Sequence, residues 1–402
     1  AVMKSRPRLA YLVSHPIQYQ APLLRRISVE ANIDLTVFFC SDLSVQTYLD
    51  DGFGQAVQWD VPLLEGYRYE FLPAIGKRHR LSFFRPLNYG LAPRLESGKF
   101  DALWLHGWGY WSHLHAIHAA HRLGIKVLMR GESGLHLDQP MRARGIIKQT
   151  LLRYLVTRVD GFLAIGTLNS EFYRKQGVQP ERIYPVPYAV DNAFFQAKAA
   201  EASASRESLR QQLGLESGRP VILYASKMTP RKRADDLLEA YRRLSPDGKI
   251  EPQPYLLFIG DGELRPRLAA RVRELGWHSV RFLGFKNQTE LPAYYDLCDV
   301  FVLPSVQEPW GLVINEVMNA GKAVIVSDEV GCGPDLVKHG ENGHVFRAGD
   351  IGDLHRALRE AFADPERTVA MGHRSLALIN RWGFDEDITG LQQALKGVLG
   401  NA

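Results

Sequence analysis

Short apolar runs alternate along the first half of the chain with longer amphipathic stretches. The apolar runs predict six buried strands, at residues 9–13, 35–39, 67–72, 102–105, 126–129 and 161–165. The amphipathic stretches predict helices between most of them, at residues 17–29, 86–97, 109–123 and 141–158. Strands that alternate with helices in this way favour a parallel sheet covered by helices.

The second half of the chain repeats this pattern. Predicted strands lie at residues 221–225, 255–259, 280–283, 300–303, 323–326 and 343–346. Predicted helices lie at residues 232–244, 263–275, 288–297, 311–320, 353–363, 366–380 and 385–398. The pattern therefore predicts an α/β protein with two doubly wound parallel sheets, and a ligand cleft at their facing strand ends.

The length of the chain also favours two domains, because 402 residues exceed what one hydrophobic core usually holds. A stretch rich in alanine, serine and charge, residues 197–208, follows the first series of strands. We expect a first domain at residues 1–195 and a second at 196–375. A C-terminal helical segment, 376–402, is expected to pack back toward the first domain.

Composition narrows the class of protein. With 46% hydrophobic and 23% charged residues, the chain resembles an ordinary globular protein, and no apolar run approaches about 18 residues. The N-terminus lacks the apolar core of a signal peptide, so we expect a cytoplasmic protein. The three cysteines lie far apart, which favours reduced structural thiols. The net charge of +5 is compatible with an anionic substrate or peripheral contact with the inner membrane face, and no nucleic-acid-binding module is recognisable.

The stretch 305–327 carries the strongest chemical signal. Two apolar runs bracket a helix opened by Gly311, and two glutamates, Glu308 and Glu316, lie eight positions apart. Val313, Val317 and Ala320 would form the buried stripe of this helix. Both carboxylates could then face a ligand beyond the strand ends, with the free amides of the helix start between them.

Two further loops follow predicted strands of the second half. Lys227, Arg231, Lys232 and Arg233 come directly after the strand 221–225. Cations at that place suit a phosphate or diphosphate, although a solvated charge run has the same composition. The sequence Gly260-Asp-Gly262 follows the next strand, and it fits a tight turn with an aspartate cap as well as a binding site. It lacks the third glycine of a dinucleotide fingerprint.

Histidines cluster in the first half of the chain. His106 ends the strand 102–105 and would lie in the cleft, although a structural role is equally open. The histidines at 113–121 lack an H-E-x-x-H motif and a nearby carboxylate, so we predict no metal site there. Asp385 and Asp387 open the last helix, where capping is a better explanation than metal binding.

Together these motifs resemble the retaining glycosyltransferases of family four, which have the GT-B fold of two facing Rossmann-like domains. Glu308 and Glu316 match the E-x7-E motif of that family, and the residues between them match its E-x-x-G-L-V setting. Lys227 and Lys232 fall where the family has the Arg and Lys of G-R-x-x-x-x-K-G. The resemblance is strongest across residues 220–346.

The resemblance implies a role for each matched residue. Glu308 would bind hydroxyls of the donor sugar and Glu316 the ribose, while Lys227 and Lys232 would neutralise the departing diphosphate. Amides of the helix start would assist them, the loop 284–286 would lie against the base, and His106 would lie near the reacting sugar. The implied catalytic residues are His106, Lys227, Lys232 and Glu308. The implied donor-binding residues are Gly260, Gly262, Gly284, Phe285, Lys286, Trp310, Gly311, Leu312, Val313 and Glu316.

The chain also departs from the family pattern. Lys227 replaces an arginine and loses bidentate geometry, Arg233 replaces a glycine, and Tyr188 with Ala189 replaces Asn-Gly. The first strand leads into residues 14–20 instead of a glycine-rich loop. Acceptor-side candidates are His15, Gln18, Tyr19, Arg130 and Glu132, for which a structural role is equally open.

We therefore predict a retaining, metal-independent hexosyltransferase without a cofactor. It would move a sugar from a UDP- or GDP-linked donor to a saccharide, lipid-linked or small-molecule acceptor, as in polysaccharide biosynthesis. The first domain would take the acceptor and the second the nucleotide sugar. Two alternatives stay open: a sugar-nucleotide epimerase on the same fold, and a non-catalytic regulator that binds nucleotide sugars.

Overall fold

A computed structural model describes residues 6–76, 81–137, 143–244 and 253–400. Contacts divide the chain into two compact units. The first unit comprises Ala1–Tyr48, Val61–Tyr188 and Phe384–Ala402, and the second comprises Leu49–Asp60 and Ala189–Gly383. Residues 77–80 and 138–142, which include the start of the predicted helix 141–158, lie outside the described parts.

The first unit contains a seven-stranded parallel sheet in the order β11-β10-β9-β8-β1-β2-β5. Its strands are β1 (Arg8–Val13), β2 (Asp34–Phe39), β5 (Arg68–Phe71), β8 (Ala102–His106), β9 (Lys126–Arg130), β10 (Gly161–Ala164) and β11 (Ile183–Pro185). Its helices are α1 (Ala21–Glu30), α2 (Leu91–Ser97), α3 (Trp111–Leu123), α4 (Ala143–Arg158), α5 (Thr167–Lys175) and α15 (Phe384–Leu399), and η1 (Leu135–Leu137) and η2 (Pro180–Arg182) are 3-10 turns. A short antiparallel hairpin joins β6 (Ala74–Ile75) to β7 (Leu87–Asn88).

The second unit contains a six-stranded sheet in the order β14-β13-β12-β15-β16-β17. Its strands are β12 (Val221–Ala225), β13 (Tyr255–Ile259), β14 (Val280–Gly284), β15 (Val300–Leu303), β16 (Ala323–Ser327) and β17 (Gly343–Phe346). Its helices are α6 (Asn192–Ser203), α7 (Arg206–Gln212), α8 (Ala234–Leu244), α9 (Arg265–Glu274), α10 (Leu291–Leu297), α11 (Leu312–Met318), α12 (Gly333–Leu336), α13 (Ile351–Ala363) and α14 (Pro365–Ile379), with a 3-10 turn η3 (Pro230–Lys232). A separate two-stranded sheet pairs β3 (Tyr48–Asp50) with β4 (Gln55–Val57).

The predicted fold class, α/β with two parallel sheets, is confirmed. All twelve predicted strands occur, because central parallel strands are buried on both faces and therefore have continuous apolar sequences. In β12 and β16, for example, every residue is buried. The strand β11 was not predicted, since two prolines interrupt its neighbourhood. None of the described helices is both long and apolar enough to cross a membrane.

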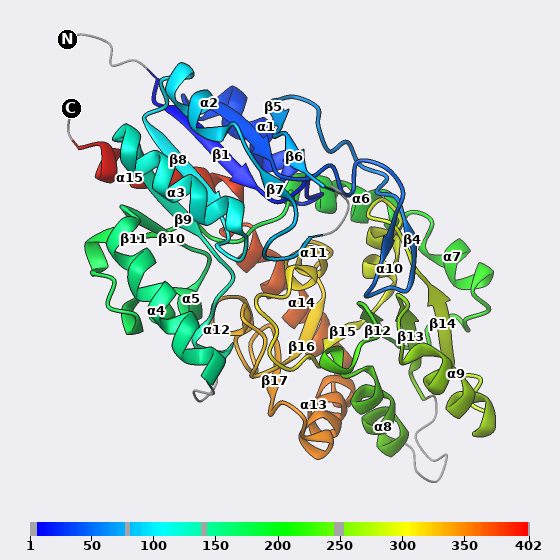
Figure 1. Ribbon diagram of the computed structural model, residues 1–402. Helices are drawn as coiled ribbons and strands as arrows, with labels where there is room; N and C mark the ends of the chain where they lie inside the picture. Colours follow the sequence, from blue (N-terminus) through cyan, green and yellow to red (C-terminus); the bar gives the residue numbers. More distant parts are fainter. Residues whose placement is uncertain (1–5, 77–80, 138–142, 245–252, 401–402) are drawn as a thin grey trace. The chain divides into compact units, whose positions relative to one another are not determined.

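The limits of the two units differ from those of the predicted domains, and the division in the middle of the chain falls between Tyr188 and Ala189 instead of after residue 195. The segment 49–60 precedes most of the first sheet in the sequence, yet it groups with the second unit. The last helix, α15, groups with the first unit, and Figure 1 shows it in red beside β10 and β11. The change of unit near the C-terminus falls between Gly383 and Phe384, just before this helix begins.

A buried ion pair fixes α15 to the first sheet. Arg130, at the end of β9, lies 2.8 Å from Asp387 of α15, and their side chains are 2% and 0% exposed. Arg130 also donates to the carbonyls of Val186 and Pro187. Asp385 pairs with Arg26 on the surface, at 2.6 Å. Both aspartates occupy the first turn as expected, but their partners are arginine side chains of the first unit.

Substituting Asp387 by Asn should destabilise the first unit by about 3 kcal/mol, because it leaves the buried guanidinium without an opposite charge. Urea unfolding of the full chain measures this change. The matched control is Asp385→Asn, whose side chain is 80% exposed, and its expected cost is below about 1 kcal/mol. Equal effects of the two substitutions would contradict a structural role for the buried pair.

Candidate functional site

The strongest candidate site lies at the carboxyl ends of β12 and β15 in the second unit. The loop after β12 leads through η3 to Lys232, and the loop after β15 carries Glu308. The Lys232 ammonium forms an ion pair with the Glu308 carboxylate, and the Arg231 guanidinium lies 3.4 Å from the same oxygen. Glu308 is 6% exposed. The sheet therefore brings two of the predicted catalytic residues into direct contact.

Burial and pairing act against each other on these charges. Burial alone would raise the pKa of Glu308, but the positive charges of Lys232 and Arg231 outweigh it and hold that pKa below its usual range. Burial lowers the pKa of Lys232, and the attraction of Glu308 offsets only part of this effect. The pair thus places an ionised carboxylate and a cation side by side in a poorly solvated position.

Two backbone features shape the loops around this pair. Arg233 adopts a left-handed conformation, with φ of 53°, at the position where the family has glycine, and its guanidinium pairs with Asp236 at 2.8 Å. Gly260 follows β13 with φ of 116°, and a Cβ there would lie 2.0 Å from the Ser226 carbonyl oxygen. The predicted glycine turn therefore packs directly against the loop that follows β12.

The second glutamate of the motif lies on α11 with a tyrosine as its partner. The Tyr295 hydroxyl of α10 donates to Glu316 at 2.6 Å. Burial raises the pKa of Glu316 to about 7, and the hydrogen bond from Tyr295 opposes this rise. The carboxyl group of Glu316 therefore titrates near neutral pH, unlike that of Glu308.

The helix α11 is shorter than predicted and buries a different face. It runs from Leu312 to Met318, and Ile314, Val317 and Met318 form its apolar buried side, whereas Val313 and Ala320 are only half-buried. Gly311 precedes it with φ of 93°. The indole of Trp310 is buried, where it donates to Asn315 and stacks on Trp382. Its side chain therefore packs within the unit, and a donor-binding role is left to its backbone amide.

Two further predicted site residues, Lys227 and Phe285, contact the segment 49–60. Lys227 pairs with Asp50, and Phe285 packs against Phe53 and Trp59. Lys286 lies 3.6 Å from Glu290. Sequence reasoning missed Asp50, because no motif marks it and the residue is 177 positions away from its partner.

In the first unit, His106 ends β8 as predicted and lies within a polar cluster. Gln20 donates to His106 Nε2 at 3.0 Å and accepts from the Tyr11 hydroxyl at 2.6 Å. The Tyr188 hydroxyl lies 3.2 Å from the same nitrogen and donates to Glu132 at 2.6 Å. Burial, followed by nearby Arg130, lowers the pKa of His106 well below its usual value. His106 is therefore a neutral imidazole at physiological pH.

The acceptor-side candidates of this unit fall into two groups. His15 and Tyr19 are half-buried near this cluster: Tyr19 packs edge-on against Tyr188, and burial lowers the pKa of His15 to about 4. Gln18 is half-buried in the same loop. Arg130 is enclosed by Asp387 of α15 and by the backbone carbonyls of residues 186 and 187, which favours the structural role. Gln20 and Tyr188 were not predicted, although both lie within stretches noted as departures from the family pattern.

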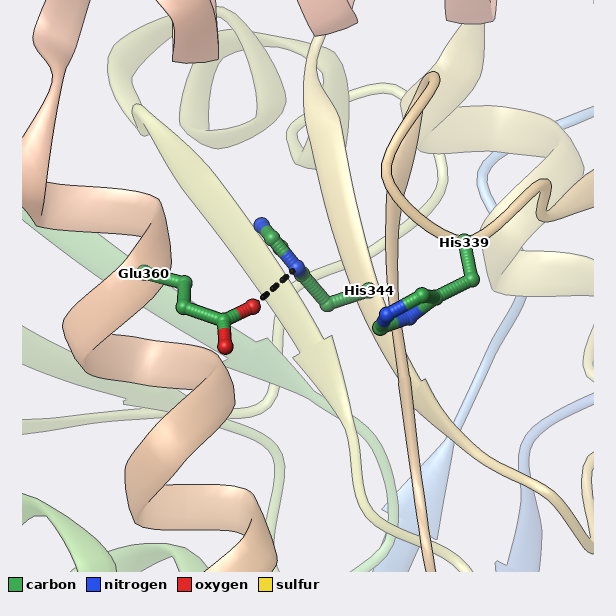
Figure 2. A group of neighbouring side chains, drawn as sticks. All are labelled: His339, His344 and Glu360. Atoms are coloured by element: carbon green, nitrogen blue, oxygen red, sulfur yellow. Dashed lines mark ion pairs between the residues drawn. The ribbon is translucent and has the colours of Figure 1, made fainter.

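One group of side chains in the described parts of the chain has the geometry to hold a metal ion: His339, His344 and Glu360 (Figure 2). His344 Nδ1 lies 3.2 Å from a Glu360 oxygen. His344 is the second residue of β17, so the group lies toward the amino end of that strand. Lys232 and Glu308 follow the carboxyl ends of their strands, so this group is separate from the ion pair.

Comparisons with known proteins give matches to part of the chain and to all of its fold. Residues 205–376 match the family described as Glycosyl transferases group 1. This region covers less than half of the chain, and it includes both lysines and both glutamates of the candidate site.

Curated relatives resemble a larger part of the chain. Alpha-D-kanosaminyltransferase of Streptomyces kanamyceticus is 27% identical over 266 residues, 64% of this chain and 66% of that protein. D-inositol 3-phosphate glycosyltransferase of Gordonia bronchialis is 26% identical over 310 residues, 73% of this chain and 65% of that protein. A GDP-mannose-dependent alpha-(1-6)-phosphatidylinositol monomannoside mannosyltransferase of Mycobacterium tuberculosis is 29% identical, covering 58% of each chain. The chain thus spans about three fifths to two thirds of the length of these relatives.

Solved structures match nearly the whole chain. HepE of Anabaena in complex with UDP and glucose has a TM-score of 0.70 at 19% identity, covering 97% of this chain and 99% of that one. Sucrose-phosphate synthase of Thermosynechococcus elongatus has a TM-score of 0.70 at 20% identity, covering 96% and 98%. These likenesses show that the fold is GT-B, as the sequence analysis expected.

The high pKa of Glu316 predicts a pH-dependent stability. Between pH 4.5 and about 7 the folded protein holds a proton that the unfolded chain has lost, so raising the pH favours unfolding. Glu316→Gln removes this effect. Between pH 4.5 and pH 8, the free energy of unfolding of the wild type should fall by on the order of 2–3 kcal/mol more than that of the variant.

Urea unfolding at several pH values measures that difference. Tyr295→Phe is the companion variant: it removes the donor that stabilises the ionised carboxylate, so the midpoint of the pH effect should rise. Parallel stability curves for the wild type and Glu316→Gln would show that Glu316 has an ordinary pKa.

Proposed function

We propose that this protein is a retaining glycosyltransferase of family four, which transfers a sugar from a nucleoside-diphosphate sugar to an acceptor. The observation that carries the proposal is the buried Lys232–Glu308 ion pair at the carboxyl ends of β12 and β15. It lies within the region that matches the glycosyltransferase family, at the carboxyl ends of the two central strands of a parallel sheet, where ligands of such folds bind. Glu308 and Glu316 are the two acidic residues of the E-x7-E motif.

The chemistry of the ion pair fits the departure of a nucleoside diphosphate. The leaving diphosphate gains negative charge as the bond to the sugar breaks, and a preorganised cation in a poorly solvated site stabilises that charge strongly. Lys232 and the nearby Arg231 supply such charge without a metal ion. Glu308, ionised beside them, can accept hydrogen bonds from sugar hydroxyls. The pair would thus hold the sugar and its leaving group at adjacent positions.

Retention of the anomeric configuration needs either an enzyme nucleophile or attack on the same face as the leaving group. We propose same-face attack guided by the leaving phosphate, because the resemblance assigns no nucleophile to this chain. Glu316 would bind the ribose. A neutral His106 suits a hydrogen bond to the reacting sugar, which is the role implied by the resemblance.

The donor and acceptor are proposed only by class. HepE was solved with UDP and glucose, and the mycobacterial relative is named for GDP-mannose, so UDP- and GDP-sugars are the first donors to test. A saccharide, lipid-linked or small-molecule acceptor fits the same chemistry. Polysaccharide biosynthesis and a cytoplasmic location remain predictions.

A panel of sugar nucleotides tests the proposal without knowledge of the acceptor. Thermal shift identifies the nucleotide that stabilises the full chain, and release of free nucleoside diphosphate measures slow donor hydrolysis. Analysis of the sugar nucleotide that remains distinguishes an epimerase, which would change the sugar and release no diphosphate. Stabilisation by none of the panel, together with absence of diphosphate release, would reject the proposal.

Lys232→Ala should reduce donor hydrolysis by on the order of 100-fold or more and weaken donor binding, because the leaving diphosphate loses its buried cation. The matched control is Lys198→Ala, which removes the same charge from a half-buried position on α6, where it pairs with Glu201. That control should keep wild-type kinetics. Near-normal turnover in a folded Lys232→Ala protein would refute the assignment of Lys232 to the diphosphate.

Metal independence predicts that EDTA changes donor hydrolysis by less than about twofold, since the leaving-group charge is met by side-chain cations. The assay is run on the wild type and on His344→Ala, because the His339, His344 and Glu360 group could bind an added ion. Loss of activity in both proteins, restored by a divalent ion, would contradict metal independence. Loss in the wild type alone would point to that group.

A further inference from the structure

The segment 49–60 belongs to the second unit, together with residues 189–383. In the sequence it lies between β2 and β5, which are strands of the first unit. In Figure 1 its strand β4, in blue, lies among the green and yellow elements of the second unit. Its contacts reach the loops that follow β12 and β14, which the resemblance assigns to the diphosphate and the base.

Asp50 holds one of the two predicted phosphate-binding lysines. Its carboxylate oxygens lie 2.8 and 2.9 Å from Lys227 Nζ, and its side chain is 11% exposed. The backbone amides of Gly52 and Phe53 donate to Asp50 at 2.9 and 3.1 Å, so the carboxylate is fixed in a tight turn. The hydrogen bond and charge of Lys227 outweigh partial burial and keep the pKa of Asp50 below its usual value.

The residues after Asp50 enclose the same lysine. A Cβ on Gly52 would lie 2.4 Å from Lys227 Cδ, so the backbone of the segment lies directly against that side chain. The Lys227 ammonium lies 4.9 Å from the centre of the Phe53 ring, within the range of a cation–π interaction. Lys227 is therefore positioned by this segment.

Phe53 and the residues near the end of the segment contact the loop after β14, which the resemblance assigns to the nucleobase. The Phe53 and Phe285 rings are 4.9 Å apart, and the Trp59 ring lies 6.3 Å from Phe285. Asn287 donates to the Gln58 carbonyl at 2.6 Å. One short segment thus connects the loop after β12 with the loop after β14.

We propose that Asp50, Phe53 and Trp59 belong to the donor-binding site, and that the diphosphate of the nucleotide sugar displaces Asp50 from Lys227. This inference rests on the proposed function. Without the donor, the Asp50 carboxylate occupies the position of an anionic ligand on Lys227 and neutralises its charge. Phe53 and Trp59 support Phe285 where the nucleobase would lie. Donor affinity is then set partly by the competition between Asp50 and the diphosphate.

Isothermal titration calorimetry of the full chain with UDP and with GDP tests this competition. Asp50→Asn keeps an oxygen that can accept from the Gly52 and Phe53 amides, but it no longer offers a negative charge to Lys227. We expect the nucleotide that the wild type prefers to bind about threefold to tenfold more tightly. The neighbouring exposed Asp51, changed to Asn, is the control and should leave affinity within twofold.

A double-substitution cycle identifies Lys227 as the mediator. Lys227→Met should weaken binding, and the gain from Asp50→Asn should disappear in the Lys227→Met background, because no cation is left to release. Unchanged or weaker binding by Asp50→Asn, or an equal gain in Asp51→Asn, would overturn the inference. A gain that persists without Lys227 would also overturn it.

Failure of this inference can be told apart from failure of the proposed function. If the wild type binds neither UDP nor GDP and Lys232→Ala changes nothing, the donor site itself is wrongly assigned. If the wild type binds a nucleotide and Lys232→Ala weakens binding, while Asp50→Asn has no effect, the donor site stands and only the role of Asp50 is refuted. Melting temperatures of the variants confirm that each one is folded.

Discussion

The ion pair between Lys232 and Glu308 is the interaction on which the candidate site depends. Both side chains are largely buried, and an unpaired charge in such a position would have a high desolvation cost. Each charge therefore depends on the other for its stability. The residues are 76 positions apart, and they meet because β12 and β15 are neighbours in the sheet. The sheet order therefore determines whether this site exists.

A second buried ion pair, between Arg130 and Asp387, shows how the same interaction serves a different purpose. It joins residues 257 positions apart and holds the last helix in the first unit. Backbone carbonyls, the Asp387 carboxylate and the Tyr188 ring surround its guanidinium, so the charge is met within the protein. The surroundings of a buried charge, more than the residue type, distinguish a structural arginine from a binding one.

The two glutamates of the motif also differ through their surroundings. Cations lower the pKa of Glu308, whereas burial beside Tyr295 raises that of Glu316. Two identical side chains eight positions apart are thus prepared for different roles: one remains an anion, and the other can change its protonation near neutral pH. This difference fits the separate roles that we propose for them at the sugar and at the ribose.

The sequence by itself determined the α/β class, all twelve predicted strands and the pair of glutamates. Buried parallel strands leave continuous apolar runs, and the E-x7-E spacing is local, so both can be read along the chain. Only the tertiary structure decided the partners: Asp50 for Lys227, Tyr295 for Glu316 and Gln20 for His106. A single polar residue has no periodic signal, and its partner lies far away in the sequence. The position of such a residue therefore becomes known only when the strands are ordered and the loops between them are placed.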